Sequence, residues 1–156
     1  MYLFVLRHGE AAPAPLGARD RDRTLTPRGE ADIAALARWM ASLSAGLTHL
    51  GCSPYVRTRQ TADLLGATLG LQPQPDRLLQ AGASTDDVRE VVHQLDVPDV
   101  ACLVIHQPTI GQLVYDLTGS RAALPPGTLA VLEASDQRLK RAHLVALLPP
   151  GLVPPA

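Results

Sequence analysis

The sequence predicts an α/β fold, with a single open and mainly parallel sheet flanked by helices on both faces. Short apolar runs typical of buried strands alternate with segments of helical periodicity through the first three quarters of the 156 residues. Hydrophobic residues make up 46% of the chain, which is enough to build a core for one domain of this size. We expect a single domain over residues 1–150 and an irregular tail over 151–156.

The first half of the chain predicts two strands and two helices. The aromatic and branched run at 2–6 is typical of a buried first strand, and the segment 10–26, rich in proline and charge, indicates a loop. A threonine cap and a proline then open a helix over 27–44, whose apolar residues recur every three or four positions. A short strand at 49–52 ends at a Ser-Pro break, and a helix follows over about 55–69.

The middle of the chain continues the alternation. Residues 73–75 suit a short extended segment, and Ser84 with Asp87 resembles a capping box that starts a helix. The almost wholly apolar run 100–105 indicates a central strand buried on both faces. A helix then runs from Pro108 to a glycine stop at 119.

Two late apolar runs, 128–132 and 143–148, are typical of strands. The polar stretch 135–140 between them suits a turn, so we expect an antiparallel pair. The proline-rich segment from Pro149 predicts irregular structure.

Composition argues against several functional classes. The formal net charge is −1, so the whole chain carries no attraction for nucleic acid or for a membrane surface. No run approaches the length of a membrane span, and the first apolar run is too short for a secretory leader. Cys52 and Cys102 each end an apolar run and are expected to be buried free thiols. We therefore expect a cytoplasmic protein, and the sequence carries no signal for an oligomeric state.

Polar side chains follow the three principal strands of the predicted sheet. Arg7, His8 and Gly9 come directly after the first strand, Arg57 lies at the start of the helix after the second, and His106 follows the buried third. The carboxyl ends of adjacent parallel strands meet at one edge, where open α/β sheets bind ligands. Two arginines, two histidines and two helix N-termini at one edge favour a phosphoryl group.

Four blocks of sequence also resemble the histidine phosphatase superfamily, the phosphoglycerate-mutase-like enzymes. Residues 6–10 (Leu-Arg-His-Gly-Glu) resemble its first motif and 25–29 (Leu-Thr-Pro-Arg-Gly) the next. Residues 53–62 resemble the block with the second arginine, and 106–111 the block with the second histidine. The short chain is similar to the small SixA-type branch, whose members remove phosphate from phosphohistidine on proteins.

The resemblance implies an enzyme and assigns roles to four residues. His8 would be the nucleophile and form a covalent phosphohistidine intermediate. Arg7 and Arg57 would hold the equatorial phosphoryl oxygens, and His106 would act as a cationic or donor clamp. The implied partner is a protein that bears phosphohistidine, such as a histidine-containing phosphotransfer domain, in a signal-transduction setting. No cofactor and no metal are expected, because arginines beside a metal site would repel the cation.

Other residues are weaker candidates for the same site. Arg23 is placed like an auxiliary phosphate contact, although most of the charged stretch around it is expected to be a solvated loop. Gly9 allows close backbone approach to the ligand, and Glu10 could orient a catalytic group or relay a proton. Asp86 and Asp87 are further candidates for the proton donor, because residues 77–87 lack the glutamate that larger relatives use as general acid.

Two alternatives to the phosphoprotein substrate stay open. The same chemistry would serve a small phosphorylated metabolite, although the missing glutamate disfavours alkyl phosphates, whose alkoxide is a poor leaving group. A non-catalytic phosphate-binding regulatory domain is the other alternative, and the intact set of four principal residues argues against it. A nucleotide-binding protein fits poorly, because no glycine-rich phosphate loop follows the first strand.

Overall fold

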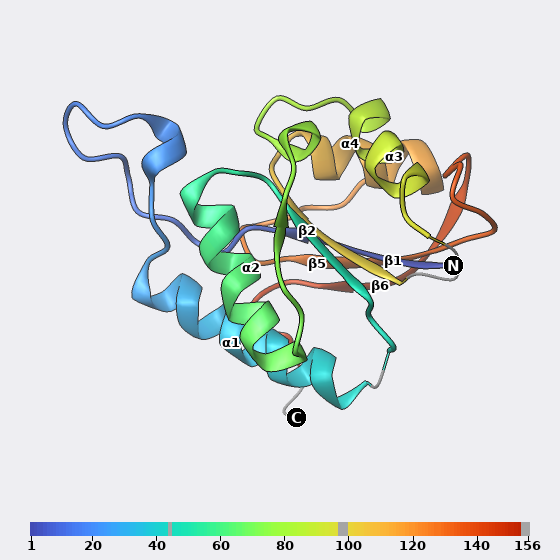
Figure 1. Cartoon of the computed structure of the whole chain (residues 1–156), viewed down its shortest axis with the longest axis horizontal. Helices are drawn as coiled ribbons and strands as arrows, with labels where there is room; N and C mark the ends of the chain where they lie inside the picture. The colour runs from blue at the N-terminus through green and yellow to red at the C-terminus, as the bar shows by residue number, and fades with distance from the viewer. Residues whose placement is uncertain (44, 97–99, 154–156) are drawn as a thin grey trace.

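A computed structural model describes residues 1–43, 45–96 and 100–153 of the chain, and Figure 1 shows its arrangement. The strands are β1 (Tyr2–Arg7), β2 (His49–Cys52), β3 (Gln74–Pro75), β4 (Ala101–Ile105), β5 (Leu129–Ala134) and β6 (Ala142–Leu148). The helices are α1 (Pro27–Ser42), α2 (Val56–Leu69), α3 (Thr85–His93) and α4 (Thr109–Thr118), with 3-10 turns η1 (Asp20–Asp22) and η2 (Arg77–Leu79).

The six strands form one sheet in the order β3-β2-β4-β1-β5-β6. β1, β2, β3 and β4 run parallel, while β5 is antiparallel to both β1 and β6. The predicted fold class, a mainly parallel sheet with a late antiparallel strand pair, is therefore confirmed.

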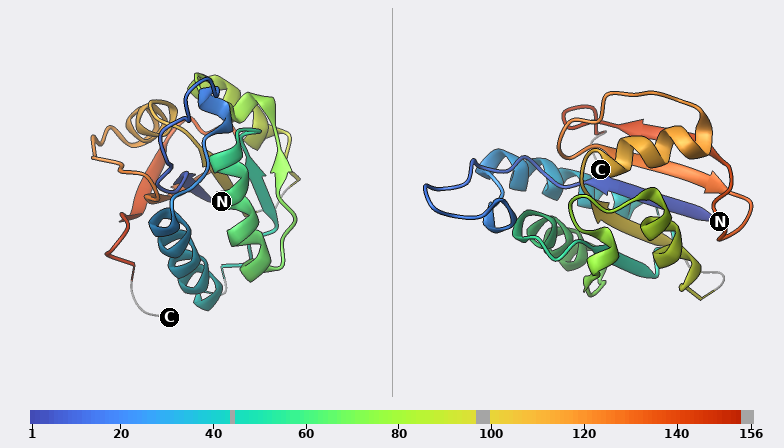
Figure 2. Two further views of the ribbon diagram at one scale, coloured as in Figure 1. Left: turned by 90° about the vertical axis from the view of Figure 1, so that its left-hand side faces the viewer. Right: turned by 90° about the horizontal axis from the view of Figure 1, so that it is seen from above.

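Helices cover both faces of the sheet. Alternate side chains of β1 point to opposite faces, so this strand contributes apolar residues to a core on each side. Leu3 and Val5 pack with α3 and α4 in one core, and Phe4 and Leu6 pack with α1 and α2 in the other. Figure 2 shows these two helical layers with the sheet between them.

The observed boundaries of the strands and helices agree with those predicted from the sequence to within a few residues. The helix predicted over 27–44 ends at Ser42, and residue 44 lies outside the described residues. The capping box predicted at Ser84 is present, with Asp87 accepting from the Ser84 backbone. The strand predicted over 128–132 extends to Ala134. The largest difference is η1, a single turn inside the segment predicted to be a loop.

Register brings the ends of three strands to one edge of the sheet. Arg7 at the end of β1 pairs with Ile105 at the end of β4, and Cys52 at the end of β2 pairs with Val104. The residues that follow these strands must therefore lie side by side, although His8 and His106 are 98 positions apart in the sequence.

None of the helices in the described part of the chain combines the length and apolarity that crossing a bilayer requires. Cys52 and Cys102 are buried and free, as expected. Burial raises the pKa of the Cys52 thiol to about 11 and that of Cys102 to about 12, so both stay protonated near neutral pH.

Candidate active site

Two histidines and an arginine form the centre of the site. The rings of His8, which follows β1, and His106, which follows β4, lie 5.2 Å apart between centroids and meet edge to face. Arg57, in the first turn of α2, lies against both: its Nε donates to Nε2 of His8 at 3.1 Å, and its Nη2 is 3.2 Å from Nδ1 of His106. The expected meeting of these side chains at one edge of the sheet is therefore present, with all three buried.

The hydrogen bonds around His8 determine which ring nitrogen is free to react. Nδ1 lies 2.8 Å from the carbonyl oxygen of Gly9, which can only accept, so Nδ1 carries the proton. Nε2 accepts the Arg57 Nε–H, so it is unprotonated and its lone pair points at the guanidinium where an anion would bind. An imidazole fixed in this tautomer can act as a nucleophile through Nε2.

His106 has the opposite orientation. Its Nδ1 faces Arg57, which has only donors, so this nitrogen accepts in the phosphate-free site. Its Nε2 then donates to the hydroxyl of Ser53 at 2.8 Å, and that oxygen also accepts from the backbone N–H of Tyr55 at 3.3 Å. Ser53 is fully buried, so His106 is held by a group that water does not reach.

Burial and positive charge keep both imidazoles neutral. Burial lowers the pKa of His8 to about 4; the Gly9 hydrogen bond opposes this shift, and the charges of Arg57, Arg7 and Arg23 add to it. Burial lowers the pKa of His106 to about 3, helped by His8 and Arg57. His8 is thus in the nucleophilic form at neutral pH. The cationic clamp expected of His106 requires a bound anion to raise its pKa.

Arg7, the last residue of β1, is close enough for its charge to act on both histidines. Its Nη1 donates to the Leu124 carbonyl at 2.6 Å, which fixes the guanidinium, while its Nε is buried without a hydrogen-bond partner. Burial lowers the Arg7 pKa, and the charge of Arg57 lowers it further. A buried N–H that lacks a partner, close to a second arginine, is suited to donate to a bound anion.

A second set of contacts ties the His8 turn to α2. The backbone N–H of Gly9 donates to the Thr61 hydroxyl at 3.1 Å, and that hydroxyl donates to the Arg57 carbonyl at 2.7 Å. A Cβ on Gly9 would lie 2.9 Å from an Ile33 side-chain carbon, so close packing, as well as conformational freedom, favours glycine there.

Both helices at the site, α2 and α4, begin without a side-chain cap and without an acidic residue in the first turn. Their N-termini therefore stay favourable to anions.

One residue of the charged loop takes a direct part in the site, while residues 19–22 are exposed, as expected for most of the stretch. Oδ2 of Asp20, in η1, accepts from Nη2 of Arg57 at 3.0 Å, and the Asp20 carbonyl accepts from Nη1 at 2.8 Å. Arg23 donates through Nε to Ala12, through Nη2 to Ala11, and through Nη1 to Asp20 at 3.2 Å. In this state Arg23 therefore supports the loop.

The three carboxylates suggested as proton donors bond elsewhere. Glu10 accepts from the Thr26 hydroxyl at 2.8 Å, at the start of α1. Asp87 belongs to the capping box of α3, and Asp86 pairs with Arg89 at 2.7 Å on the exposed side of that helix.

Sequence reasoning gave no role to Asp20, Ser53, Tyr55 or Thr61. The last three lie in the block that carries Arg57, at helix or turn spacing from it, so the motif itself holds the signal. The Tyr55 ring packs edge to face on His106 at 5.1 Å and lies 5.1 Å from the Arg57 guanidinium carbon. Asp20 is one of several alternating charges in the loop, and nothing in that pattern selects it.

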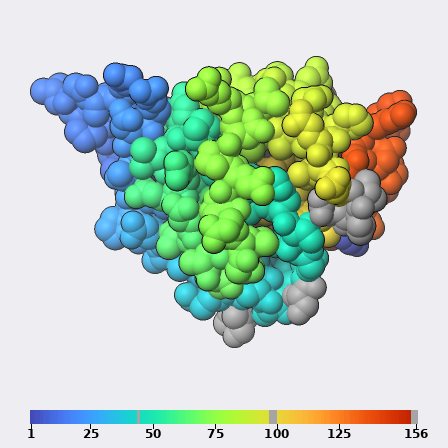
Figure 3. Space-filling view, viewed as in Figure 1, coloured from blue at the N-terminus to red at the C-terminus, as the bar shows by residue number. Residues whose placement is uncertain are grey.

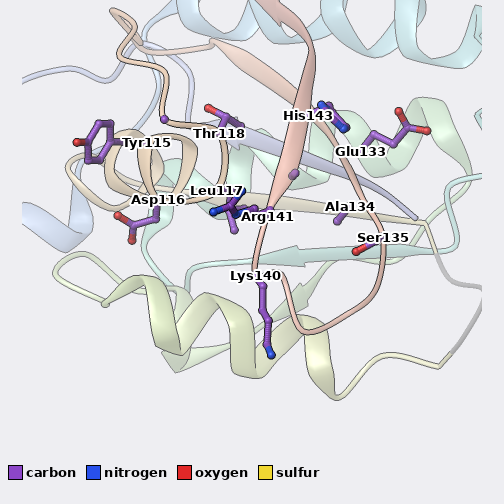
Figure 4. A pocket seen from close by; sticks show the side chains of 12 residues that line it. Tyr115, Asp116, Leu117, Thr118, Glu133, Ala134, Ser135, Lys140, Arg141 and His143 are labelled. Carbon is purple, nitrogen blue, oxygen red and sulfur yellow. The ribbon is translucent and has the colours of Figure 1, made fainter.

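The described residues present no metal site, and a hollow among them lies away from the candidate active site. No cluster of three or more His, Cys, Asp or Glu side chains in that part of the chain is arranged to hold a metal ion. A hollow does lie at the other end of the sheet, between the end of α4 and the β5–β6 hairpin (Figure 4). Its lining includes Asp116, Lys140 and His143, but none of the residues of the candidate active site.

Comparison with known protein families identifies the superfamily to which the chain belongs. The model of the histidine phosphatase superfamily (branch 1) matches residues 3–81, about half of the chain. The chain belongs to this superfamily. The enzyme class expected from the sequence, a histidine phosphatase, is thereby confirmed.

Similar proteins include members of the SixA branch. Phosphohistidine phosphatase SixA of Escherichia coli is 30% identical over 122 residues, which cover 75% of this chain and 74% of SixA. An uncharacterised protein of Picosynechococcus sp. is 30% identical over 147 residues, covering 90% and 89% of the two chains.

Solved structures share the fold over almost the whole chain. A putative SixA from Nakamurella multipartita is 27% identical with a TM-score of 0.83, and 96% of each chain is covered. A SixA bound to tungstate superposes with a TM-score of 0.85 at 22% identity, covering 96% of this chain and 97% of that one. The expected resemblance to the SixA branch is confirmed.

Proposed function

We propose that this chain is a metal-independent phosphatase that removes the phosphoryl group from phosphohistidine on a protein, through a covalent intermediate on His8. The observation that carries the proposal is the state of His8. Its Nδ1–H is fixed on the Gly9 carbonyl, and its Nε2 lone pair faces the guanidinium of Arg57. A phosphoryl group bound by Arg57 would therefore lie next to the nucleophilic nitrogen.

The first chemical step transfers the phosphoryl group to His8. Nε2 of His8 forms a bond to phosphorus while the bond from phosphorus to the substrate nitrogen breaks, and the leaving imidazole takes up a proton from solvent water. Arg7 and Arg57 stabilise the charge on the equatorial oxygens. His106 gains a proton beside the bound anion and then donates through Nδ1.

The second step returns the enzyme to its starting state. A water molecule attacks phosphorus, the bond between phosphorus and Nε2 of His8 breaks, and inorganic phosphate leaves. Gly9 keeps the imidazole in one tautomer throughout, so no ring rotation separates the two steps. The two arginines supply the positive charge that a metal ion would otherwise provide, and they would repel one.

The choice of substrate rests on the leaving group. Glu10, Asp86 and Asp87 bond to other partners, so the site offers none of these carboxylic acids to protonate a departing alkoxide. Imidazole leaves more readily than an alkoxide, so phosphohistidine suits the site. The E. coli relative is named as a phosphohistidine phosphatase. A phosphorylated histidine-containing phosphotransfer domain is the partner we propose.

A substrate panel tests the proposal. A phosphorylated phosphotransfer domain, a phosphohistidine peptide, p-nitrophenyl phosphate and several sugar phosphates are assayed with the wild type and with His8→Asn as a background control. Phosphohistidine and the aryl phosphate are expected to react ~100-fold faster than the sugar phosphates, the scale of a missing general acid. Equal rates on a sugar phosphate would favour a metabolite phosphatase, and no turnover of any member would favour a phosphate-binding regulatory domain.

A further inference from the structure

The contact between Asp20 and Arg57 joins an exposed surface turn to a buried arginine of the site. The Asp20 side chain is 59% exposed, whereas the Arg57 side chain is only 5% exposed. The Asp20 carboxylate is nevertheless bound to the guanidinium at 3.0 Å and also to Arg23 at 3.2 Å. A surface turn thus places an anion on an arginine that the proposed chemistry needs for the phosphoryl group.

We propose that Asp20 is an internal anion that holds Arg57 while the site is free of phosphate, and that an incoming phosphoryl group must displace it. The proposal rests on the proposed function only in that the site binds a phosphoryl group. Figure 1 shows η1 close to the N-terminal end of α2, the position that this role requires.

The hydrogen bonds of Arg57 make the two anions compete. A guanidinium has five N–H donors, and in this state four of its hydrogen bonds go to His8, His106 and two oxygens of Asp20. A phosphoryl group on Nε2 of His8 would need donors from the same edge. Carboxylate and phosphoryl oxygens bind a guanidinium in the same manner, so one replaces the other.

Electrostatics supports the same competition. Burial raises the Asp20 pKa, but the hydrogen bonds and charges of Arg23 and Arg57 outweigh that effect and bring the pKa below its usual value. Asp20 is therefore ionised, and leaving it beside a phosphoryl dianion would place like charges together. Release of the carboxylate removes this repulsion.

The loop can release Asp20 without losing its base. Ala11 pairs with Leu25 in an antiparallel bridge, and the Arg23 side chain bonds to the Ala11 and Ala12 carbonyls. Beyond that base, residues 13–22 are exposed and project from the body of the molecule (Figure 3). Movement of η1 therefore uncovers little buried surface.

The test measures anion binding. Inorganic phosphate and tungstate are titrated into the wild type and into Asp20→Asn by calorimetry. Asp20→Asn keeps the side-chain shape and removes the competing charge, so both anions are expected to bind about fivefold tighter, the scale of one partly exposed ion pair. Asp20→Glu keeps the charge and is expected to stay closer to the wild type than Asp20→Asn does.

A matched control separates displacement from general charge. Asp22→Asn removes the same charge from the same turn, where Asp22 pairs with Arg21 instead of Arg57. Its affinity for both anions is expected to match the wild type. An equal gain in Asp22→Asn, or unchanged or weaker binding in Asp20→Asn, overturns the proposal.

Hydrogen exchange supplies a second measurement. The amides of Asp22 and Arg23 bond to the carbonyls of Arg19 and Asp20. Tungstate should speed their exchange in the wild type, because η1 is released, and should change it little in Asp20→Asn. Slower exchange in the wild type would mean that the loop closes on the anion, which also overturns the proposal.

The two proposals can fail separately. If neither the wild type nor any variant binds either anion, both the proposed function and the role of Asp20 fail. If anions bind but phosphohistidine is not turned over, only the substrate assignment fails.

Discussion

His8 and His106 are the same side chain with opposite ring nitrogens facing the pocket. A carbonyl holds Nδ1 of His8 and turns Nε2 toward Arg57, whereas a buried hydroxyl holds Nε2 of His106 and turns Nδ1 toward the same guanidinium. Sequence predicts that both histidines reach one edge of the sheet. The nucleophilic role of His8 also predicts that its other ring nitrogen donates to a backbone carbonyl. The sequence does not predict which nitrogen this is, or that Ser53 holds His106, because both depend on geometry that no residue pattern records.

A direct titration tests the neutral state of both rings. Their pKa values of about 4 and about 3 lie below the ordinary value of 6.5, so each ring stays neutral at pH 6.5 and takes up a proton only as the pH falls through these lower values. NMR of 15N-labelled histidine, assigned with His8→Asn and His106→Asn, should show both rings titrating below pH 5. Tungstate should move the His106 titration upward. A midpoint near 6.5 for either ring in the free protein would contradict this account.

At the scale of elements, caps and periodicity predicted the helices well. The cap by Thr26 and the capping box at Ser84 are both visible in the sequence because they act over three residues. The loop before α1 was less predictable. Its 3-10 turn, η1, contacts Arg57 through Asp20, and these two residues are 37 positions apart in the sequence.

The close approach of α1 to the turn after β1 leads to a prediction at this scale. A Cβ on Gly29, in the first turn of α1, would overlap the Glu10 carbonyl oxygen and lie 2.8 Å from the Glu10 nitrogen, and backbone cannot rotate away as a side chain does. Gly29→Ala should therefore lower the free energy of unfolding by about 1–3 kcal/mol, as overpacking does. It should also reduce turnover, because the same turn positions His8.

Gly111→Ala is the matched control for this variant. Gly111 is also helical, but its Cβ would meet only the Gln107 side chain, which can move. Helix propensity then favours alanine, by up to about 1 kcal/mol. Urea unfolding measures both variants, and a Gly29→Ala protein as stable as the wild type would show that α1 and the turn after β1 can separate without cost.

At the scale of the whole molecule, the sheet assembles a site from distant parts of the sequence. The match to the superfamily model ends at residue 81, so it leaves out His106. The pairing of Arg7 with Ile105 places His106 beside His8 all the same. The alternation of strands and helices made this topology predictable. What was not predictable is how the 10–24 loop folds back over the sheet edge, because that depends on tertiary contacts.

Trapping the covalent intermediate tests the central claim most directly. The wild type is mixed for milliseconds with a phosphotransfer domain carrying 32P on its histidine, quenched in alkali and digested, and the labelled peptide is sequenced by mass spectrometry. The account predicts label on His8 in the wild type, together with neither label nor turnover in His8→Asn. Turnover without label on His8, or label that persists in His8→Asn, would contradict it.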